Sequence, residues 1–117
     1  MDLSQASQAH AEWKVKLRLA IAKQEQLDVS VITTDKACAL GKWLHGEART
    51  QYGGLKSYAE CCQRHAAFHQ EAGAVAATIN RGDYTKASQM LDGGTRYAAA
   101  SSAVGSAILG LKKEAAL

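Results

Sequence analysis

The residues of this 117-residue chain whose types and spacing could do chemistry are its four histidines and three cysteines. Two of the histidines, His65 and His69, stand four positions apart in the stretch HAAFH, with only two alanines and a phenylalanine between them. Positions i and i+4 of a helix lie about 6 Å apart and point the same way, so two imidazoles so placed can converge on one ion. The spacing raises the hypothesis of a metal site, against the alternative of core histidines with ordinary hydrogen-bond partners.

His10 is the third histidine that falls on a predicted apolar seam, and it comes from a different segment of the chain. Burying three neutral imidazoles without partners would cost on the order of several kcal/mol. A shared metal ion would remove that cost. A closed tetrahedral zinc site takes four protein ligands, and a thiolate is the expected type for the fourth. From spacing alone, the metal site and the satisfied core histidines remain equal alternatives.

The three cysteines compete for the fourth position. Cys62 lies on the same helix as the histidine pair, but about 10 Å along the axis from its second member, too far for both to hold one ion. Cys38 comes from another predicted helix and can approach from the open side. Its place in the first turn of a helix capped by Asp35 also favours the thiolate. Cys61 and Cys62 are interpreted as small apolar residues, and His45 as a surface residue.

Hydrophobic periodicity predicts the helices that would position these residues. The first stripe consists of Leu3, Ala6, His10, Trp13, Leu17 and Ala20. The run LDVSVITTD reads as a connector. The further predicted helices are KACALGKWLHGEAR behind an Asp35 cap, Leu55 to about Asn80, and one long final helix from an Asp83 cap through Gly93 and Gly94 to Leu111. Four helices with short links predict an all-α fold, an antiparallel four-helix bundle with an extra short helix. The length suits a single domain over residues 1–117.

Composition narrows the classes of function. The chain has no proline and 47% hydrophobic residues, which favours helices over sheets. Its formal net charge of +3 comes from basic residues scattered among acids, so neither nucleic acid nor a membrane surface is an expected partner. No stretch approaches the roughly 20 apolar residues of a membrane span. The polar N-terminus lacks the features of a secretory signal, so we expect a cytoplasmic protein with reduced cysteines.

Catalysis is not expected. HAAFH has the histidine spacing of a zinc-protease helix, but Ala66 stands where that motif needs a glutamate as general base. A carboxylate-bridged di-iron bundle needs several inward-facing acids, and the predicted seams hold none. A cysteine nucleophile would need one base and an oxyanion hole rather than several histidines around Cys38. We therefore predict a binding protein and not an enzyme.

Three stretches of the chain resemble the chemoreceptor zinc-binding (CZB) domain family, which occurs in bacterial chemoreceptors, in some diguanylate cyclases and as a freestanding unit. They are HAEWKVKLRLAI, DKACALGKWLHGEARTQYG and HAAFHQEAGAVA, and the resemblance covers nearly the whole chain. It implies a Zn²⁺ ion held by three histidines and one cysteine. The matching positions are His10, Cys38, His65 and His69, with no departure at any ligand. The resemblance also selects Cys38 among the three cysteines.

The resemblance further implies a zinc-binding sensory domain of bacterial signal transduction, whose output responds to zinc occupancy or to oxidation of Cys38. Acid is a third stimulus to consider, because protonation of the histidines would weaken the site. The expected partners are a second copy of the chain and a fused or docked chemoreceptor or cyclase domain. Small residues of the final helix, namely Gly94, Ala98, Ser101 and Gly105, could form the homodimer contact. The alternative function is a purely structural zinc in a helical dimerisation module.

Two companion residues also receive predictions. Trp13, three positions after the first histidine of the site, is expected to pack over the site and shield it from water. Gly41 is expected to allow a close approach of its helix to a neighbouring segment.

Overall fold

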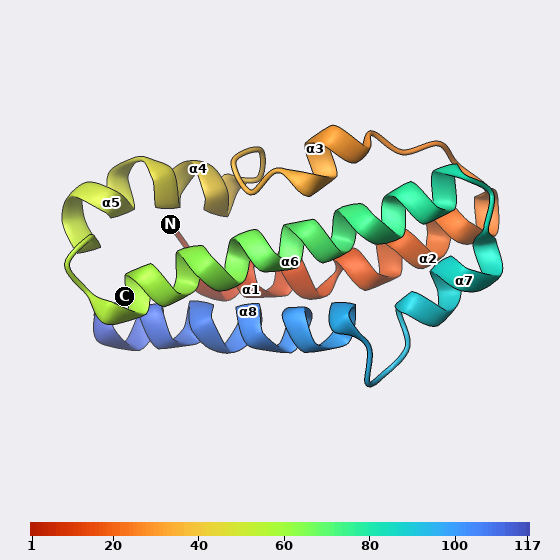
Figure 1. Ribbon diagram of the computed structural model, residues 1–117. Helices are drawn as coiled ribbons and strands as arrows, with labels where there is room; N and C mark the ends of the chain where they lie inside the picture. Colours follow the sequence, from red (N-terminus) through yellow and green to blue (C-terminus); the bar gives the residue numbers. More distant parts are fainter.

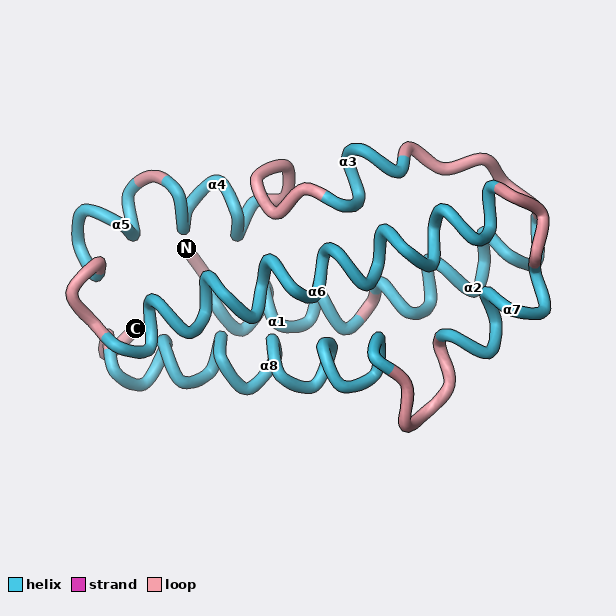
Figure 2. Tube along the Cα trace, viewed as in Figure 1, coloured by secondary structure: helices cyan, strands magenta, loops and turns pink.

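The computed structural model describes all residues 1–117 and contains helices and loops but no strand (Figures 1 and 2). The all-helical prediction is therefore confirmed. None of the helices combines the length and the hydropathy that crossing a bilayer requires. The elements in chain order are α1 (Leu3–Ala11), α2 (Trp13–Lys23), α3 (Val29–Thr33), α4 (Ala39–His45), α5 (Glu47–Tyr52), α6 (Lys56–Asn80), α7 (Tyr84–Met90) and α8 (Arg96–Glu114).

The long helices α6 and α8 and the rod formed by α1 and α2 make up the body of the molecule. Helix α6 packs against α8 on one side and α3 on another, and α8 also packs against α1. Asp2 begins α1, because its carboxylate accepts a hydrogen bond from the Gln5 N–H at 3.1 Å. The predicted first helix is interrupted at Glu12, where α1 ends and α2 begins. Its predicted apolar stripe is buried except for Trp13, which is half-buried.

The short helices α3, α4 and α5 form the fourth side of the molecule and lie in a row along α6 (Figure 1). The stretch predicted as a connector thus contains α3. The prediction that Asp35 caps the second helix is wrong. Cys38 is the N-cap of α4, and its Sγ accepts a hydrogen bond from the Gly41 N–H at 3.4 Å. The close approach expected at Gly41 is present, because a Cβ there would overlap the Asp35 carbonyl oxygen.

The prediction of one long final helix is also wrong, because a loop separates α7 from α8. The Asp83 cap is confirmed, since its side chain accepts from the Lys86 N–H at 3.2 Å. The chain then leaves the helix at Met90, and Gly94 adopts φ of +80°, a left-handed conformation that suits glycine. Thr95 starts α8 by accepting from the Ala98 N–H at 3.2 Å. The periodicity predicted one helix because apolar residues recur with the same spacing on both sides of the loop.

Gly73 allows α3 to lie close against α6. A Cβ at this position would overlap Thr33 Oγ1 and lie 2.9 Å from Thr33 Cβ. We expect Gly73→Ala to lower the free energy of unfolding by about 1–3 kcal/mol, because α3 must shift outward. The matched control is Gly110→Ala in α8, where a Cβ meets nothing within 4 Å. This change should raise the free energy of unfolding by about 0.5–1 kcal/mol. Urea denaturation measures both, and equal effects of the two changes would contradict this view of the α3–α6 contact.

Candidate metal centre

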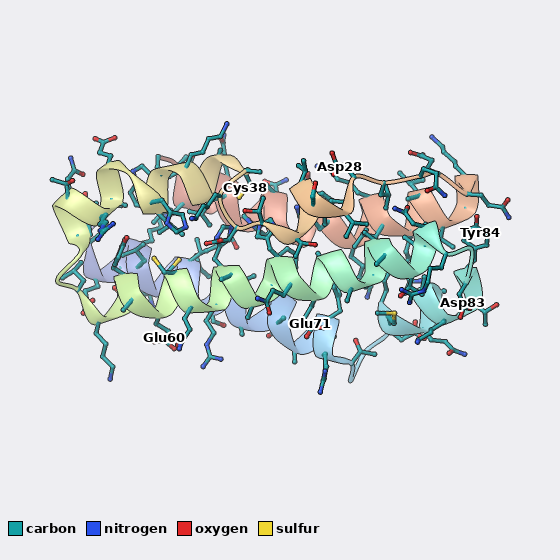
Figure 3. The ribbon with its side chains drawn as sticks, turned by 45° about the horizontal axis from the view of Figure 1, so that its top comes forward. Asp28, Cys38, Glu60, Glu71, Asp83 and Tyr84 are labelled. Carbon is teal, nitrogen blue, oxygen red and sulfur yellow. The ribbon has the colours of Figure 1, made fainter.

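The structure brings all four predicted site residues together from three helical segments. His10 lies in the last turn of α1, and His65 and His69 lie on successive turns of α6. Cys38, labelled in Figure 3, lies at the start of α4. Their ligand atoms all lie within 4.8 Å of one another. We call this set of four residues the His/Cys cluster. The three histidines are 4%, 0% and 2% exposed in chain order, whereas Cys38 is only half-buried.

Five of the six distances between ligand atoms of the His/Cys cluster are close to the edges of a small tetrahedron, and the sixth, between His10 and His69, is within 4.8 Å. The Nε2 atom of His65 lies 3.1 Å from the Nε2 atoms of both His10 and His69. Cys38 Sγ lies 3.8, 3.2 and 3.6 Å from the Nε2 atoms of His10, His65 and His69. Ordinary Zn–N and Zn–S bond lengths give edges of about 3.3 Å between nitrogens and about 3.6 Å between nitrogen and sulfur. These five distances therefore suit tetrahedral coordination of an ion of the size of zinc, and a small shift of the His10 or His69 ring would complete the tetrahedron.

Two of the imidazoles are held so that their Nε2 lone pairs face the centre of the cluster. His10 Nδ1 lies 2.7 Å from the Ala6 carbonyl oxygen, and His69 Nδ1 lies 2.8 Å from the Ile32 carbonyl oxygen. A carbonyl oxygen only accepts, so each Nδ1–H must donate and each neutral ring carries no proton on Nε2. A backbone carbonyl on the outer nitrogen is the usual way in which proteins orient a histidine toward a metal.

The protein atoms around His65 do not satisfy the hydrogen-bonding capacity of its ring. Its Nδ1 is buried and has no hydrogen-bond partner. A neutral ring has one proton, so His65 can present a single Nε2–H to its neighbours at most, and then its Nδ1 lone pair stays unpaired. In either tautomer of His65, nitrogen lone pairs of the histidines and the Cys38 sulfur face one another, and no positively charged side chain lies among them. A divalent cation supplies that charge, and three nitrogens with one sulfur are a donor set that zinc accepts.

Phe68 forms a wall of the cluster that the sequence did not assign. Its fully buried ring packs edge-on against the rings of His10 and His69, with centroid distances of 5.5 Å to each. The signal lay in the motif itself, since Phe68 stands inside HAAFH.

Trp13, predicted to shield the site, is half-buried against the core, and the Lys16 ammonium lies 5.1 Å from its ring centroid. Phe68, and not Trp13, is the aromatic residue that packs directly on the rings of His10 and His69 and excludes water from them.

The other cysteines lie outside the His/Cys cluster. Cys61 is fully buried, and burial, together with the charge of Cys62, raises its pKa to about 12. Burial also raises the pKa of Cys62. Both groups therefore stay in the thiol form at neutral pH, which is unsuited to metal binding.

His45 is exposed, as expected, and its Nε2–H donates to the Asp35 carboxylate at 2.8 Å. Burial acts to raise the pKa of Asp35, but the hydrogen bond and charge of His45 outweigh it, and the net pKa is lowered. Asp35 therefore pairs with a surface histidine. It makes no hydrogen bond to any member of the cluster.

Metal-free protein should lose stability in acid. Burial and the neighbouring histidines lower the pKa of His65 from 6.5 to about 3, and burial also lowers the pKa of His10. The unfolded chain therefore binds protons below pH 6.5 that the folded chain does not. The free energy of unfolding should stay level above that pH and fall below it, by up to about 1.4 kcal/mol per pH unit for each histidine. Urea denaturation across this range, with His45→Gln as control, measures the slope; a flat profile would contradict neutral burial of these rings.

Comparison with known proteins gives one match. The profile of the family described as the chemoreceptor zinc-binding domain matches residues 10–76, a range that begins at His10 and includes every member of the His/Cys cluster. Neither the curated proteins nor the solved structures give a match to this chain.

Proposed function

Because this chain belongs to the chemoreceptor zinc-binding domain family, we propose that the His/Cys cluster holds one Zn²⁺ ion and that the protein is a zinc-dependent sensory domain. The observation that carries the proposal is the convergence of three imidazole Nε2 atoms and one Sγ within 4.8 Å. Four protein ligands close the coordination sphere and leave no position for a catalytic water, so we propose no enzymatic activity.

When bound, zinc would supply a cross-link between α1, α4 and α6. The residues of the chain would then transmit its presence or absence. Cys38 is the N-cap of α4, a helix of only seven residues that follows a loop, so this ligand is held less firmly than those in the 25-residue α6. His69 connects the cluster to α3 through the Ile32 carbonyl. Zinc occupancy would therefore bias the position of the α3–α4 segment against α6, and a fused or docked chemoreceptor or cyclase domain would read that position.

Oxidation of Cys38 would give the same site a redox response. The thiolate reacts with hypochlorous acid to give a sulfenic acid and chloride, in which sulfur is oxidised by two electrons and chlorine is reduced. The product is a poorer ligand than the thiolate, so the hold on the cation weakens. The half-buried position of Cys38 makes it the most accessible member of the cluster. A thiolate ligand that must stay reduced suits a cytoplasmic location.

Purely structural zinc is the second candidate, and the distribution of the core favours the sensor over it. The hydrophobic core contains 21 buried apolar residues drawn from all eight helices, in addition to the three buried histidines. Apolar burial of this extent can hold the helices together without the ion, whereas small domains that depend on structural zinc are unfolded in its absence. We therefore expect a folded metal-free state that zinc can regulate.

A homodimer remains part of the proposal, with one change of surface. Gly105, one of the small residues predicted at the dimer contact, faces α1, because a Cβ there would lie 4.0 Å from Ser7 Oγ. The exposed small residues of α8 lie on another side and include Ala99 and Ser106. These residues, beside α6, are the surface that we propose for the second copy.

Elemental analysis with hydrogen–deuterium exchange tests the proposed function. Protein purified with zinc present should carry one zinc per chain, and Cys38→Ser should carry much less. Zinc should slow amide exchange in residues 29–45 more than in the centre of α6, because that segment is tied to α6 through the ion. Equal protection throughout the chain would contradict the sensory mechanism and leave only a structural role, and absence of zinc would contradict the site itself.

A further inference from the structure

One surface cavity reaches the His/Cys cluster. Its volume is about 280 Å³, and both His10 and Cys38 line it. None of the other four cavities is lined by any member of the cluster. The walls come from α1 on one side and the start of α4 on the other, and include Gln5, Ala9 and Ala39. The cluster therefore opens to the surface between the first helix and the Cys38 turn.

The exposure of the four residues shows which of them lie nearest to this opening. His65 and His69 are 0% and 2% exposed, and neither of them lines the cavity. Only Cys38 is half-buried. A solute that approaches through the cavity meets the sulfur and His10 before it meets the two histidines of α6.

Asp2 is the one acidic residue that lines the cavity. Its side chain is exposed, and one carboxylate oxygen accepts from the Gln5 N–H at 3.1 Å, which leaves the other oxygen without an assigned partner. The chain as a whole carries a net charge of +3, which repels cations. A carboxylate at the rim offsets that repulsion locally and raises the concentration of divalent cations at the opening.

We propose that this cavity is the path by which a divalent cation reaches and leaves the His/Cys cluster, that Asp2 attracts the cation at the rim, and that Cys38 is the first ligand to meet it. This inference rests on the proposed function, since it concerns the regulation of the same site. It makes the rate of zinc exchange a property of the cavity, separate from the affinity set by the four ligands.

Filling the cavity tests the path. Ala9→Leu narrows it from α1 and Ala39→Leu from α4; both alanines are exposed and neither is a ligand. In stopped-flow measurements with zinc and a fluorescent zinc chelator, at least one of them should slow both uptake and release by about tenfold, as gating does, while the equilibrium affinity changes by less than about threefold. Ala74→Leu, on an exposed alanine of α6 that lines a different cavity, is the control and should exchange at the native rate.

Removing the charge at the rim tests the role of Asp2. Asp2→Asn keeps an oxygen that can cap α1, so only the charge is lost. Uptake at low ionic strength should slow by about two- to fivefold, and the difference should vanish at high salt. Asp83→Asn is the matched control, because Asp83 caps α7 in the same way at 3.2 Å and lies outside the cavity.

The outcomes separate this inference from the proposed function. If the native protein binds zinc but both leucine variants exchange it at the native rate, the path is wrong and the zinc site stands. If Asp2→Asn and Asp83→Asn slow uptake equally, Asp2 has no special role at the rim. If the native protein takes up no zinc at all, the proposed function fails and the path fails with it.

Discussion

Replacing His65 with alanine is expected to lower the affinity for zinc at least about 100-fold, because loss of even an outer-shell partner of a metal ligand costs 10- to 100-fold. His65 has the central place in the cluster. Its Nε2 lies 3.1 Å from the Nε2 atoms of His10 and His69 and 3.2 Å from Cys38 Sγ. Competition with a chelator of known affinity measures the loss.

His45→Ala is the matched control for this prediction, since His45 is exposed and bonded to Asp35 rather than to the cluster. It should bind zinc with native affinity. Circular dichroism checks that both variants keep their helices. A folded His65→Ala protein that binds zinc as tightly as the native chain would show that the ion lies elsewhere.

Removing zinc is expected to lower the stability of the protein without unfolding it. A ligand present at about 1,000 times its dissociation constant stabilises the folded state by roughly 4 kcal/mol. For a domain of this size, that corresponds to a shift in Tm on the order of 15 °C. The metal-free protein should still melt cooperatively, because 21 buried apolar residues from all eight helices form its core. Thermal melts with added zinc and with excess chelator measure the difference.

Two results would contradict this prediction in different ways. A metal-free protein without helical signal at room temperature would make the zinc structural. Identical melting temperatures with zinc and with chelator would mean that the folded chain does not bind the ion. His65→Ala serves as the control here as well, since its Tm should not respond to zinc.

The elements that depend on local sequence could be predicted, and those that depend on tertiary contacts could not. Helix α6 was predicted within a residue of its bounds, because Leu55 to Asn80 carries an unbroken apolar seam. The final helix was predicted wrongly, because periodicity is blind to a left-handed glycine such as Gly94 when the same seam resumes beyond it. The Asp35 cap was wrong because a cysteine sulfur, rarely considered a helix cap, takes that role at Cys38.

The features of the site that depend on local sequence could also be predicted, and those that depend on tertiary contacts could not. The convergence of His65 and His69 follows from helix geometry alone, and the seam containing His10 brings it to the same interior. The partner of His69 could not be predicted, because the Ile32 carbonyl reaches it only when α3 lies against Gly73. The cavity beside Cys38 arises from two segments far apart in sequence and has no local signal.

The central claim is that one zinc ion is held by three imidazoles and one thiolate of this chain. X-ray absorption at the zinc edge of the loaded protein tests it most directly. We expect a four-coordinate spectrum with three nitrogen scatterers at about 2.0–2.1 Å and one sulfur at about 2.3 Å, and loss of the sulfur scatterer in Cys38→Ser. A spectrum of the native protein that contains only nitrogen and oxygen neighbours, or the same sulfur signal in Cys38→Ser, would contradict the claim.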